Sequence, residues 1–545
     1  MNQFDKRDST LILSHIIFGF IALLLGGIAG LLQSLVRGGA VELPMGIGYY
    51  QLLTAHGVLM ALVFTTFFII GFLYSAIAKT LGGELLPRAR TLGWIGFGSM
   101  AFGTILGVIL ILLNKATVLY TFYAPMQAHP LYYVALVFLV VGSWISGFGM
   151  FFQYARWRKA HKGETSPLLA FMSVVTMLLW LVACLGVAAT VLVQFIPWSL
   201  GWTDRIDVVL SRTLFWYFGH PLVYFWLLPA YMCWYVVIPK IIGGKVFSDA
   251  LARLAFIMFL LFSIPVGFHH QLMEPGISSF WKFLQVVLTF MVIIPSLMTA
   301  FSIFATFELT GRAKGAKGLF GWFKLLPWRD TRFFSAFMGM LIFIPAGAGG
   351  VINASNQMNA VVHNTLWVTG HFHLTVATTV ALTFFSMTYW LVPSLLGRTL
   401  TPRMNRLGNI QTILWLIGMF FMSGSMHLVG LFGSPRRTAY TTYGDHPDTI
   451  LWMPYHVAMA IGGTILFIAL VLMVYNLFAL MRTPKGETEY PIAETSEQAV
   501  QAPRILERLG LWVGVLAVLI LIAYAVPVTD MITNDTPGAK GFVTW

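Results

Sequence analysis

The chain has 545 residues, of which 58% are hydrophobic and only 10% are charged, and its mean hydropathy is +0.81. A soluble domain usually has about a quarter of its residues charged, so this composition excludes an ordinary soluble protein. The formal charge of +13 could indicate a nucleic-acid-binding protein, but the positions of the basic residues along the chain argue against that class.

Apolar segments of about twenty residues, long enough to cross a bilayer of roughly 30 Å, recur along the whole chain. We predict an all-α, polytopic bundle of about 13 transmembrane helices that forms a single domain over residues 1–545. The predicted spans are 11–34, 52–78, 92–113, 132–154, 170–197, 207–239, 253–271, 279–309, 333–350, 358–393, 408–433, 451–481 and 511–530. No small-residue cleavage site precedes the first span, which is therefore predicted to be a retained helix and not a signal peptide.

The basic residues are divided unevenly between the two sides of this predicted bundle. The N-terminal segment and the alternate loops, together with Arg253 at the edge of a span, contain 25 of the 33 Lys and Arg residues. This is the positive-inside pattern, which predicts a cytoplasmic N-terminus and an external C-terminus. The charge is thus typical of a protein embedded in a lipid bilayer, and no nucleic-acid partner is expected.

Six of the thirteen histidines lie inside or at the ends of predicted spans, in chain order His56, His220, His269, His270, His371 and His373. Ionisable groups at membrane depth are costly and commonly functional. In the predicted orientation all six belong to the outer part of the membrane, with His220 and His371 about thirteen residues, or roughly 20 Å, into their spans. A single such histidine is more often a core residue bonded to a neighbouring helix. Six at a common level indicate a metal site.

The spacing of these histidines limits what they can bind. His371 and His373 are two residues apart, about 200° of helical rotation, so their rings point to opposite sides and one helix could bind two cofactors. The adjacent His269 and His270 can converge on one ion if the helix ends there. Imidazole suits copper, iron and zinc. Together with His220, this pair would leave an open position on a copper ion.

Tyr224 follows His220 by four residues and shares its helix face. Pro221 between them removes a backbone donor and is expected to loosen the helix beside the ligand. A phenol next to a metal-bound imidazole could give up an electron and a proton together. An interhelical hydrogen bond is the alternative reading of this tyrosine.

Hydroxyl side chains follow two further helix faces from this region toward the cytoplasmic side. Tyr231 and Tyr235 continue the face of Tyr224, at offsets of seven and eleven residues. A later span carries a second set spaced by three, namely Ser296, Thr299 and Ser302. These groups could conduct protons to a buried site, or they could form the interhelical hydrogen bonds that Ser and Thr commonly supply in membranes.

Four motifs give the chain a resemblance to the heme-copper oxidase superfamily. They are LTAHGV at 53–58, GHPLVY at 219–224, FHHQ at 268–271 and HNTLWVTGHFH at 363–373. The match covers nearly the whole chain and is closest to the B-family, the ba-type cytochrome c oxidases. The resemblance implies a terminal respiratory oxidase of a prokaryotic cytoplasmic membrane that reduces dioxygen to water and translocates protons.

The resemblance implies three sets of cofactor ligands. His56 and His373 would bind the iron of a low-spin heme of b or a type, and His371 would bind the iron of a high-spin heme, expected to be of a type. His220, His269 and His270 would bind the copper ion called CuB. It also implies that Tyr224 is cross-linked to the His220 imidazole. Arg436 and Arg437 would pair with heme propionates, which suits adjacent arginines near the outer surface.

The resemblance also implies a single proton channel, formed by the residues Tyr231, Tyr235, Ser296, Thr299 and Ser302. Leu222 stands where the A-family usually has an acid, which fits the B-family. Asn359 departs from the pattern, because the ba-type enzymes are expected to have an acid in this proton-loading region.

The chain has only two cysteines, Cys184 and Cys233, and no CuA-type cluster of cysteine and histidine. A subunit II that carries CuA is therefore expected to deliver electrons from cytochrome c, with quinol as the alternative donor and small membrane subunits as further partners. Nitric oxide reduction is the nearest alternative function, but the reductases of this superfamily lack the active-site tyrosine. A heme-handling transporter is the alternative from another class.

Overall fold

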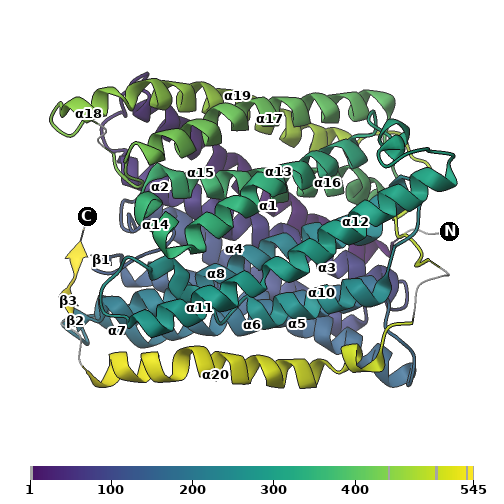
Figure 1. Cartoon of the computed structure of the whole chain (residues 1–545), viewed down its shortest axis with the longest axis horizontal. Helices are drawn as coiled ribbons and strands as arrows, with labels where there is room; N and C mark the ends of the chain where they lie inside the picture. Colours follow the sequence, from purple (N-terminus) through teal and green to yellow (C-terminus); the bar gives the residue numbers. More distant parts are fainter. Residues whose placement is uncertain (1–3, 440–441, 497–500, 535–537, 544–545) are drawn as a thin grey trace.

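The computed structural model describes residues 4–439, 442–496, 501–534 and 538–543, and it consists mainly of long helices packed side by side (Figure 1). Among the described residues, 12 helices are long and apolar enough to cross a membrane. The prediction of an all-α, polytopic bundle is confirmed. The N-terminal and C-terminal ends of the chain lie at opposite ends of the bundle (Figure 1).

Several long helices are interrupted by a turn of π-helix, and the described elements follow in chain order. The first half contains α1 (Lys6–Arg37), α2 (Tyr49–Gly57), η1 (Val58–Phe64), α3 (Thr65–Thr80), α4 (Pro87–Leu112), α5 (Pro130–Ala160), α6 (Leu168–Ala189), η2 (Thr190–Phe195), α7 (Ile196–Ser199), α8 (Val208–Met232), η3 (Cys233–Val237), α9 (Ile238–Ile241) and α10 (Asp249–Phe262). The second half contains η4 (Gly267–Gln271), α11 (Ser279–Met291), α12 (Ile293–Ala313), η5 (Gly321–Leu325), α13 (Thr331–Ala354), α14 (Asn356–Val362), α15 (Leu366–Leu374), η6 (Thr375–Val380), α16 (Ala381–Leu396), α17 (Pro402–Leu431), α18 (Pro447–Ile450), α19 (Met453–Leu480), η7 (Arg504–Glu507) and α20 (Leu509–Thr533).

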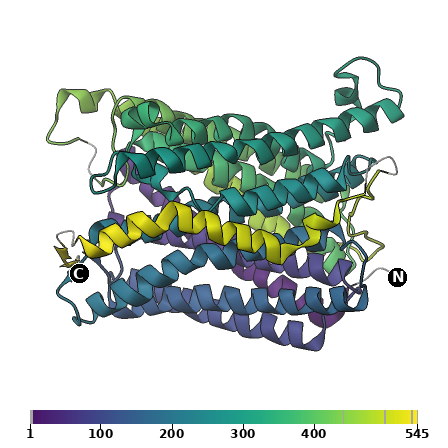
Figure 2. The same ribbon diagram turned by 60° about the horizontal axis from the view of Figure 1, so that its bottom comes forward.

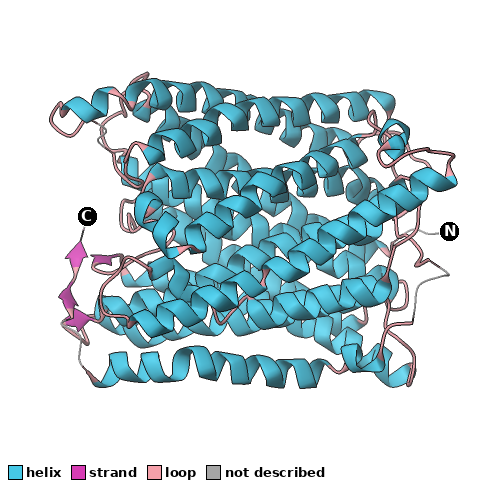
Figure 3. Cartoon of the chain, viewed as in Figure 1, coloured by secondary structure: helices cyan, strands magenta, loops and turns pink. Residues whose placement is uncertain are grey.

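The described strands are short and lie at the C-terminal end of the bundle (Figure 3). β1 (Met126–Gln127) pairs in parallel with β4 (Phe542–Val543), and β2 (Arg205–Ile206) pairs antiparallel with β3 (Ala539–Lys540). These pairs fasten the last described residues to two loops. Helix α20, just before them, lies along the outside of the bundle, where it contacts α10 and α11 (Figure 2).

Polar residues mark the points where the apolar helices begin. Side-chain oxygens of Asp207, Thr365 and Thr401 accept hydrogen bonds from backbone N–H groups in the first turns of α8, α15 and α17. Such caps satisfy donors that the intrahelical ladder leaves free. They fix the starts of α8 and α15, two of the helices that carry the predicted histidines.

The predicted span 253–271 is wrong as a continuous helix. Helix α10 is only 14 residues long and ends at Phe262, and a separate 3-10 turn, η4, begins at Gly267. Pro265 lies in the break, where it lacks a backbone donor and disfavours a helical conformation of the residue before it. The histidine pair 269–270 therefore lies in a tight turn beyond the helix. The two ends of the chain lie at opposite ends of the bundle, so the chain crosses the bundle an odd number of times. Twelve described helices are long enough to span a membrane, and α10 together with η4 provides the remaining crossing.

The predicted span 358–393 is also wrong at its start. Helix α14 is a separate short helix, Asn364 has a φ of +59°, and α15 begins only at Leu366. The left-handed backbone at Asn364 interrupts the helical path. His371 is therefore five residues beyond the first residue of its helix, and not about thirteen residues as the sequence suggested.

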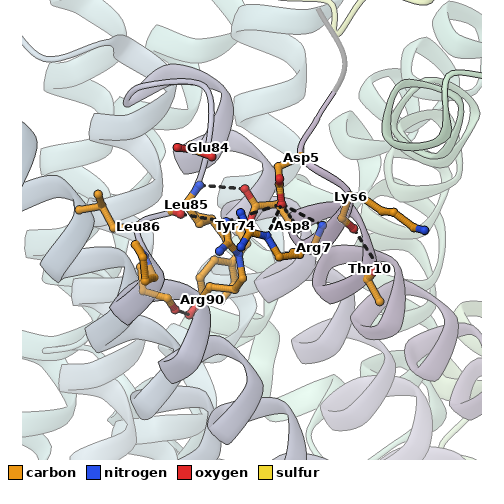
Figure 4. A network of polar contacts seen from close by, with 12 residues as sticks. Asp5, Lys6, Arg7, Asp8, Thr10, Tyr74, Glu84, Leu85, Leu86 and Arg90 are labelled. Carbon is orange, nitrogen blue, oxygen red and sulfur yellow. Dashed lines mark hydrogen bonds and ion pairs between the residues drawn. The ribbon is translucent and has the colours of Figure 1, made fainter.

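At the N-terminal end of the bundle, a buried ion pair joins α1 to α4 (Figure 4). The Asp8 side chain is fully buried, and its Oδ1 lies 2.5 Å from Arg90 Nε. Its other oxygen accepts a hydrogen bond of 2.8 Å from the backbone N–H of Leu85. Nearby, the more exposed Asp5 pairs with Arg7 at 3.3 Å. Asp8 thus has both oxygens satisfied inside the protein.

Replacing Arg90 by Met should leave the Asp8 carboxylate buried without its cation. Breaking a buried ion pair from one side typically costs about 3 kcal/mol or more of unfolding free energy. Thermal unfolding of the purified protein in detergent measures the loss. Arg7→Gln is the control, because the Arg7 side chain is 70% exposed, and it should scarcely change the midpoint. An Arg90→Met midpoint equal to that of the unmodified protein would contradict this role of the pair.

Candidate functional site

His56 of α2 and His373 of α15 face each other with their rings nearly parallel. The ring centroids are 6.3 Å apart and the planes differ by 16°. His56 Nδ1 lies 2.9 Å from the carbonyl oxygen of Gly26, and His373 Nδ1 lies 2.8 Å from that of Thr369. A carbonyl can only accept, so each Nδ1 carries a hydrogen and donates it. Both Nε2 atoms are thereby left free as metal ligands.

This spacing fits one metal ion between the two rings. An imidazole nitrogen lies about 1.1 Å from its ring centroid, so two facing nitrogens would be about 4 Å apart, twice the roughly 2 Å of a metal–histidine bond. Gly30 provides the space for the His56 ring, because a Cβ at this position would lie 2.6 Å from His56 Nδ1. Helix α1 thus positions His56 in two ways: the Gly26 carbonyl accepts a hydrogen bond from its ring, and Gly30, which has no side chain, leaves space for that ring.

A cavity of about 280 Å³ contains this histidine pair, and mainly apolar side chains line it. Its lining also includes the cations Arg37, Arg436 and Arg437. Among the described residues that line it there is no Asp or Glu. An apolar cavity with two facing imidazoles and a cationic edge suits a flat iron macrocycle with carboxylates on one side.

The two adjacent arginines are held in place by neighbouring loops. Arg436 donates two hydrogen bonds to the Asn364 side-chain oxygen, at 2.8 and 3.2 Å. Burial and, to a smaller extent, the charge of Arg437 lower the pKa of Arg436 to about 10, so Arg436 is still a cation at neutral pH. The Arg437 guanidinium lies over the Tyr123 ring, 4.9 Å from its centroid. Both arginines therefore present charge to a cavity whose described lining contains no carboxylate.

His220, His269 and His270 form a second group, in which one ligand nitrogen from each residue lies within 4.8 Å of the others. His220 Nδ1 and His270 Nε2 are 3.1 Å apart. Thr289 donates its hydroxyl hydrogen to the Gln285 carbonyl at 2.6 Å, so it accepts from His269 Nδ1 at 2.9 Å, which leaves His269 Nε2 free. Three imidazoles around one point, without a carboxylate, suit a copper ion with an open position.

The tight turn that carries His269 and His270 is fixed by three neighbouring helices. The Tyr524 hydroxyl of α20 accepts a hydrogen bond from the Gly267 N–H at 2.9 Å. The Gln285 side chain of α11 accepts from the Phe268 N–H at 2.8 Å and donates to α20. The ring of Trp216, from α8, stacks on His270 at a centroid distance of 3.7 Å. These contacts hold the adjacent imidazoles toward His220.

Tyr224 lies beside His220 as the spacing predicts, with ring centroids 5.1 Å apart. His220 Nε2 is buried and has no hydrogen-bond partner within the described parts of the chain. The expected loosening at Pro221 is not observed, since α8 continues through this residue and the π-helical turn comes later, at η3. A reactive phenol is thus next to a buried ring nitrogen that lacks a partner.

His371 lies on another side of α15 from His373, also as the spacing predicts. It contacts α13, where a Cβ added to Gly349 would lie 2.8 Å from His371 Nδ1. The Thr375 hydroxyl lies 3.4 Å from the same nitrogen. One helix therefore presents two imidazoles to two different environments.

The predicted hydroxyl groups are brought together in part. Tyr235 donates a hydrogen bond of 3.0 Å to Thr299, which in turn donates to the Pro295 carbonyl. Tyr231 is fully buried, and its ring lies 5.3 Å from that of Phe259. Ser302 Oγ is buried and has no hydrogen-bond partner in the regions that the structure describes, while Ser296 is half-buried. Helices η3 and α12 thus meet through hydroxyl groups.

Asn359, in the middle of the short helix α14, takes part in a short hydrogen-bond chain. Its side-chain oxygen accepts from His363 Nδ1 at 3.0 Å, and its amide donates to the Asn353 carbonyl at 2.7 Å. Burial and, to a smaller extent, the charge of Arg436 lower the pKa of His363. An asparagine and a neutral histidine therefore occupy this position.

Residues that support the site were not recognised from the sequence. Thr289, Gln285 and Tyr524 position the histidine pair 269–270, and Arg37 adds a third cation to the cavity. Polar residues on an apolar helix carry no signal of their own beyond a general tendency to hydrogen-bond between helices. Only their contacts in three dimensions distinguish them.

Comparisons with known proteins show which family the chain resembles. Residues 10–465 match the family described as "Cytochrome C and Quinol oxidase polypeptide I". The chain is 40% identical to cytochrome c oxidase subunit 1 of Thermus thermophilus, over 98% of this chain and 97% of that protein. It is 24% identical to cytochrome c oxidase subunit 1 of Bacillus sp. (strain PS3), over 87% and 75% of the two chains. A solved heme-copper terminal oxidase dimer has a similar structure, with a TM-score of 0.93 and 36% identity over 98% of this chain and 95% of that one.

Replacing Thr289 by Val should weaken metal binding by the three-histidine group. Loss of the hydroxyl that fixes the His269 tautomer is expected to lower metal affinity about 10-fold to 100-fold. Copper content after dialysis against a chelator, measured by elemental analysis, tests this. Thr412→Val is the control, because within the described residues the buried Thr412 hydroxyl bonds only the Gly408 carbonyl of its own helix. Equal copper retention in both variants would contradict the role of Thr289.

Proposed function

This chain belongs to the family of subunit I of the cytochrome c and quinol oxidases, and on that premise we propose that its six histidines hold the cofactors for dioxygen reduction. It is the catalytic subunit of a heme-copper terminal oxidase, an oxidoreductase and a multi-pass membrane protein. The observation that carries the proposal is the separation of the histidines into a facing pair, a group of three and a single ring.

The proposed ligands are His56 and His373 for a low-spin heme of b or a type, His371 for a high-spin heme of a type, and His220, His269 and His270 for CuB. Arg436 and Arg437 would pair with heme propionates at the edge of the cavity. When bound, these groups supply electron transfer and the reduction of dioxygen. The protein fixes the ring nitrogens, shields the site and supplies protons. We also propose that residues 1–545 form one functional domain.

Tyr224 is the proposed catalytic residue. Its ring lies next to that of His220, and the unpartnered His220 Nε2 is the atom on which the cross-link implied by the family would form. A phenol can give up its O–H proton and an electron at the same place. The buried surroundings exclude competing reactions with bulk water.

Protons are proposed to reach the site along the residues Tyr231, Tyr235, Ser296, Thr299 and Ser302. The Tyr235–Thr299 hydrogen bond supports a route between η3 and α12. Buried polar atoms without protein partners, such as Ser302 Oγ, are the places where ordered water completes a hydrogen-bond chain. Proton uptake from the N-terminal side requires that this end of the bundle face the cytoplasm, which is the proposed orientation.

The chain is subunit I of an oxidase complex, and its expected partners follow from what its sequence lacks. Cys184 and Cys233 are both buried and lie on different elements, so a CuA centre is proposed to belong to a separate subunit II. Cytochrome c is the proposed electron donor, with small membrane subunits as further partners. A prokaryotic cytoplasmic membrane is the proposed location. Nitric oxide reduction is not favoured, because the described metal-ligating group contains three histidines and no carboxylate.

Tyr224→Phe should keep both hemes and copper but reduce oxygen consumption at least about 100-fold, the scale of a lost proton-transfer group. Oxygen uptake with a reduced donor measures turnover, and the optical spectrum reports the hemes. Tyr217→Phe is the matched control, since Tyr217 is a buried tyrosine of the same helix outside the histidine group. Full oxygen consumption by Tyr224→Phe would remove the catalytic role of this tyrosine.

Thr299→Val should slow proton uptake roughly tenfold, because the lost hydrogen bond from Tyr235 is worth about 1 to 1.5 kcal/mol. Proton uptake after flash-initiated turnover in vesicles measures the rate. Thr176→Val is the control, because in the part of the chain that the structure describes the buried Thr176 hydroxyl bonds only the Met172 carbonyl of its own helix. An unchanged rate of proton uptake in Thr299→Val would indicate that these hydroxyl groups have only a structural role.

A further inference from the structure

The loop that joins α12 to α13 exposes several large apolar side chains within a short stretch. Leu319, Phe320, Phe323 and Leu325 are all exposed, and Phe320 is the most exposed of them, at 64%. The loop projects at the N-terminal end of the bundle (Figure 2). Large apolar side chains that gather on one exposed surface mark a site of interaction with a membrane or with another protein.

Two tryptophans hold this loop in a fixed shape. Trp322 is buried against α12, where its ring stacks on that of Phe307 at a centroid distance of 5.4 Å. Its Nε1 donates a hydrogen bond to the Leu319 carbonyl at 2.9 Å. Trp328 Nε1 donates to the Phe323 carbonyl, also at 2.9 Å. The apolar side chains are therefore exposed by a folded loop whose own contacts keep them pointing outward.

The exposed side chains of the loop continue an apolar face of α12. Leu297, Phe301 and Phe304 are exposed and lie on one side of this helix, at offsets of four and seven residues. The helical segment that ends with α12 is long and apolar enough to cross a membrane, so this exposed side is suited to lipid. The ring of Phe320 is 6.4 Å from that of Phe304 between centroids. Phe320 therefore lies where the apolar face reaches the membrane boundary.

The same segment carries an excess of positive charge. Residues 314–329 include four Lys or Arg residues and no Asp or Glu. The nearest acids in the sequence, Glu308 and Asp330, each pair with an arginine outside this segment. In the described part of the chain, no carboxylate pairs with Lys317 or Lys324. Anionic lipid headgroups attract such a segment, and each Lys or Arg near the membrane surface adds to the attraction.

We propose that the loop 314–330 is an interfacial anchor that binds anionic phospholipids at the N-terminal end of the bundle. Phe320 and Phe323 enter the boundary between headgroups and acyl chains, and Lys317 and Lys324 contact the phosphate groups. Apolar side chains among basic ones are typical of segments that lie in this boundary. The continuity with α12 favours a bilayer over a soluble protein, because the bilayer already lies against that face. The inference does not depend on the chemistry of the histidines.

A nitroxide label at position 320 tests the insertion of the loop. Phe320→Cys can be labelled selectively within this chain, because Cys184 and Cys233 are both buried. In vesicles of phosphatidylcholine and phosphatidylglycerol, the label on the purified complex should collide more with dissolved oxygen than with a water-soluble nickel complex. Power saturation in electron paramagnetic resonance measures both collision rates. Glu487→Cys is the control, because Glu487 is an exposed acid in the loop after α19 and its label should favour the nickel complex.

Replacing both Lys317 and Lys324 by Gln in the labelled chain tests the role of the charge. This double variant should shift the equilibrium between inserted and water-exposed label about tenfold or more toward the exposed form, because two attractions to the anionic surface are lost. Lys159→Gln combined with Lys162→Gln is the matched control. It removes two exposed lysines at the end of α5 and in the loop after it, and it should leave the label at position 320 inserted.

A label at position 320 that meets the nickel complex freely in these vesicles would overturn the proposal. A label shielded from both oxygen and nickel would also overturn it, because a protein would then cover the loop. Insertion should weaken in vesicles of phosphatidylcholine alone. Equal insertion in both kinds of vesicle, or in both double variants, would remove the preference for anionic lipid and the proposal with it.

Discussion

The hydrogen bond on one nitrogen of an imidazole decides which nitrogen can bind a metal. His56 and His373 each donate through Nδ1 to a backbone carbonyl, and His269 donates through Nδ1 to Thr289. Each acceptor belongs to a helix or turn of the packed bundle, so its position is set by the fold. The remaining nitrogens are unprotonated and point away from these acceptors, which is the state that a metal ligand requires.

The surroundings of these histidines divide the chemistry between two regions. The facing pair lies in a mainly apolar cavity with three arginines, which suits a group that exchanges electrons and has carboxylates at its edge. The group of three lies beside Tyr224, which can supply a proton and an electron where dioxygen would bind. Helix α15 joins the two regions, because it carries both His371 and His373. Short, fixed separations between the proposed cofactors follow from this single helix.

Much of this arrangement could be predicted from the sequence, because the periodicity of apolar residues and the spacing of polar residues reflect the local geometry of a helix. The apolar spans, the opposite directions of His371 and His373 and the closeness of Tyr224 to His220 all follow from helical rotation. The predicted spans are wrong where the helix is interrupted at Pro265 and Asn364, because an apolar hydropathy pattern continues across a short interruption of a helix. Arg37 was not recognised because its partners, the loop 435–438 and the cavity, are about four hundred residues away in the sequence.

One chain is proposed to bind two hemes in different ligand environments and one copper ion. The most direct test is the optical spectrum of the reduced, purified complex with and without carbon monoxide, combined with iron and copper analysis. We predict two heme irons and one copper per chain in addition to any copper of subunit II, with carbon monoxide bound by one heme only. Carbon monoxide binding by both hemes, a single heme, or non-heme iron in place of copper would contradict it.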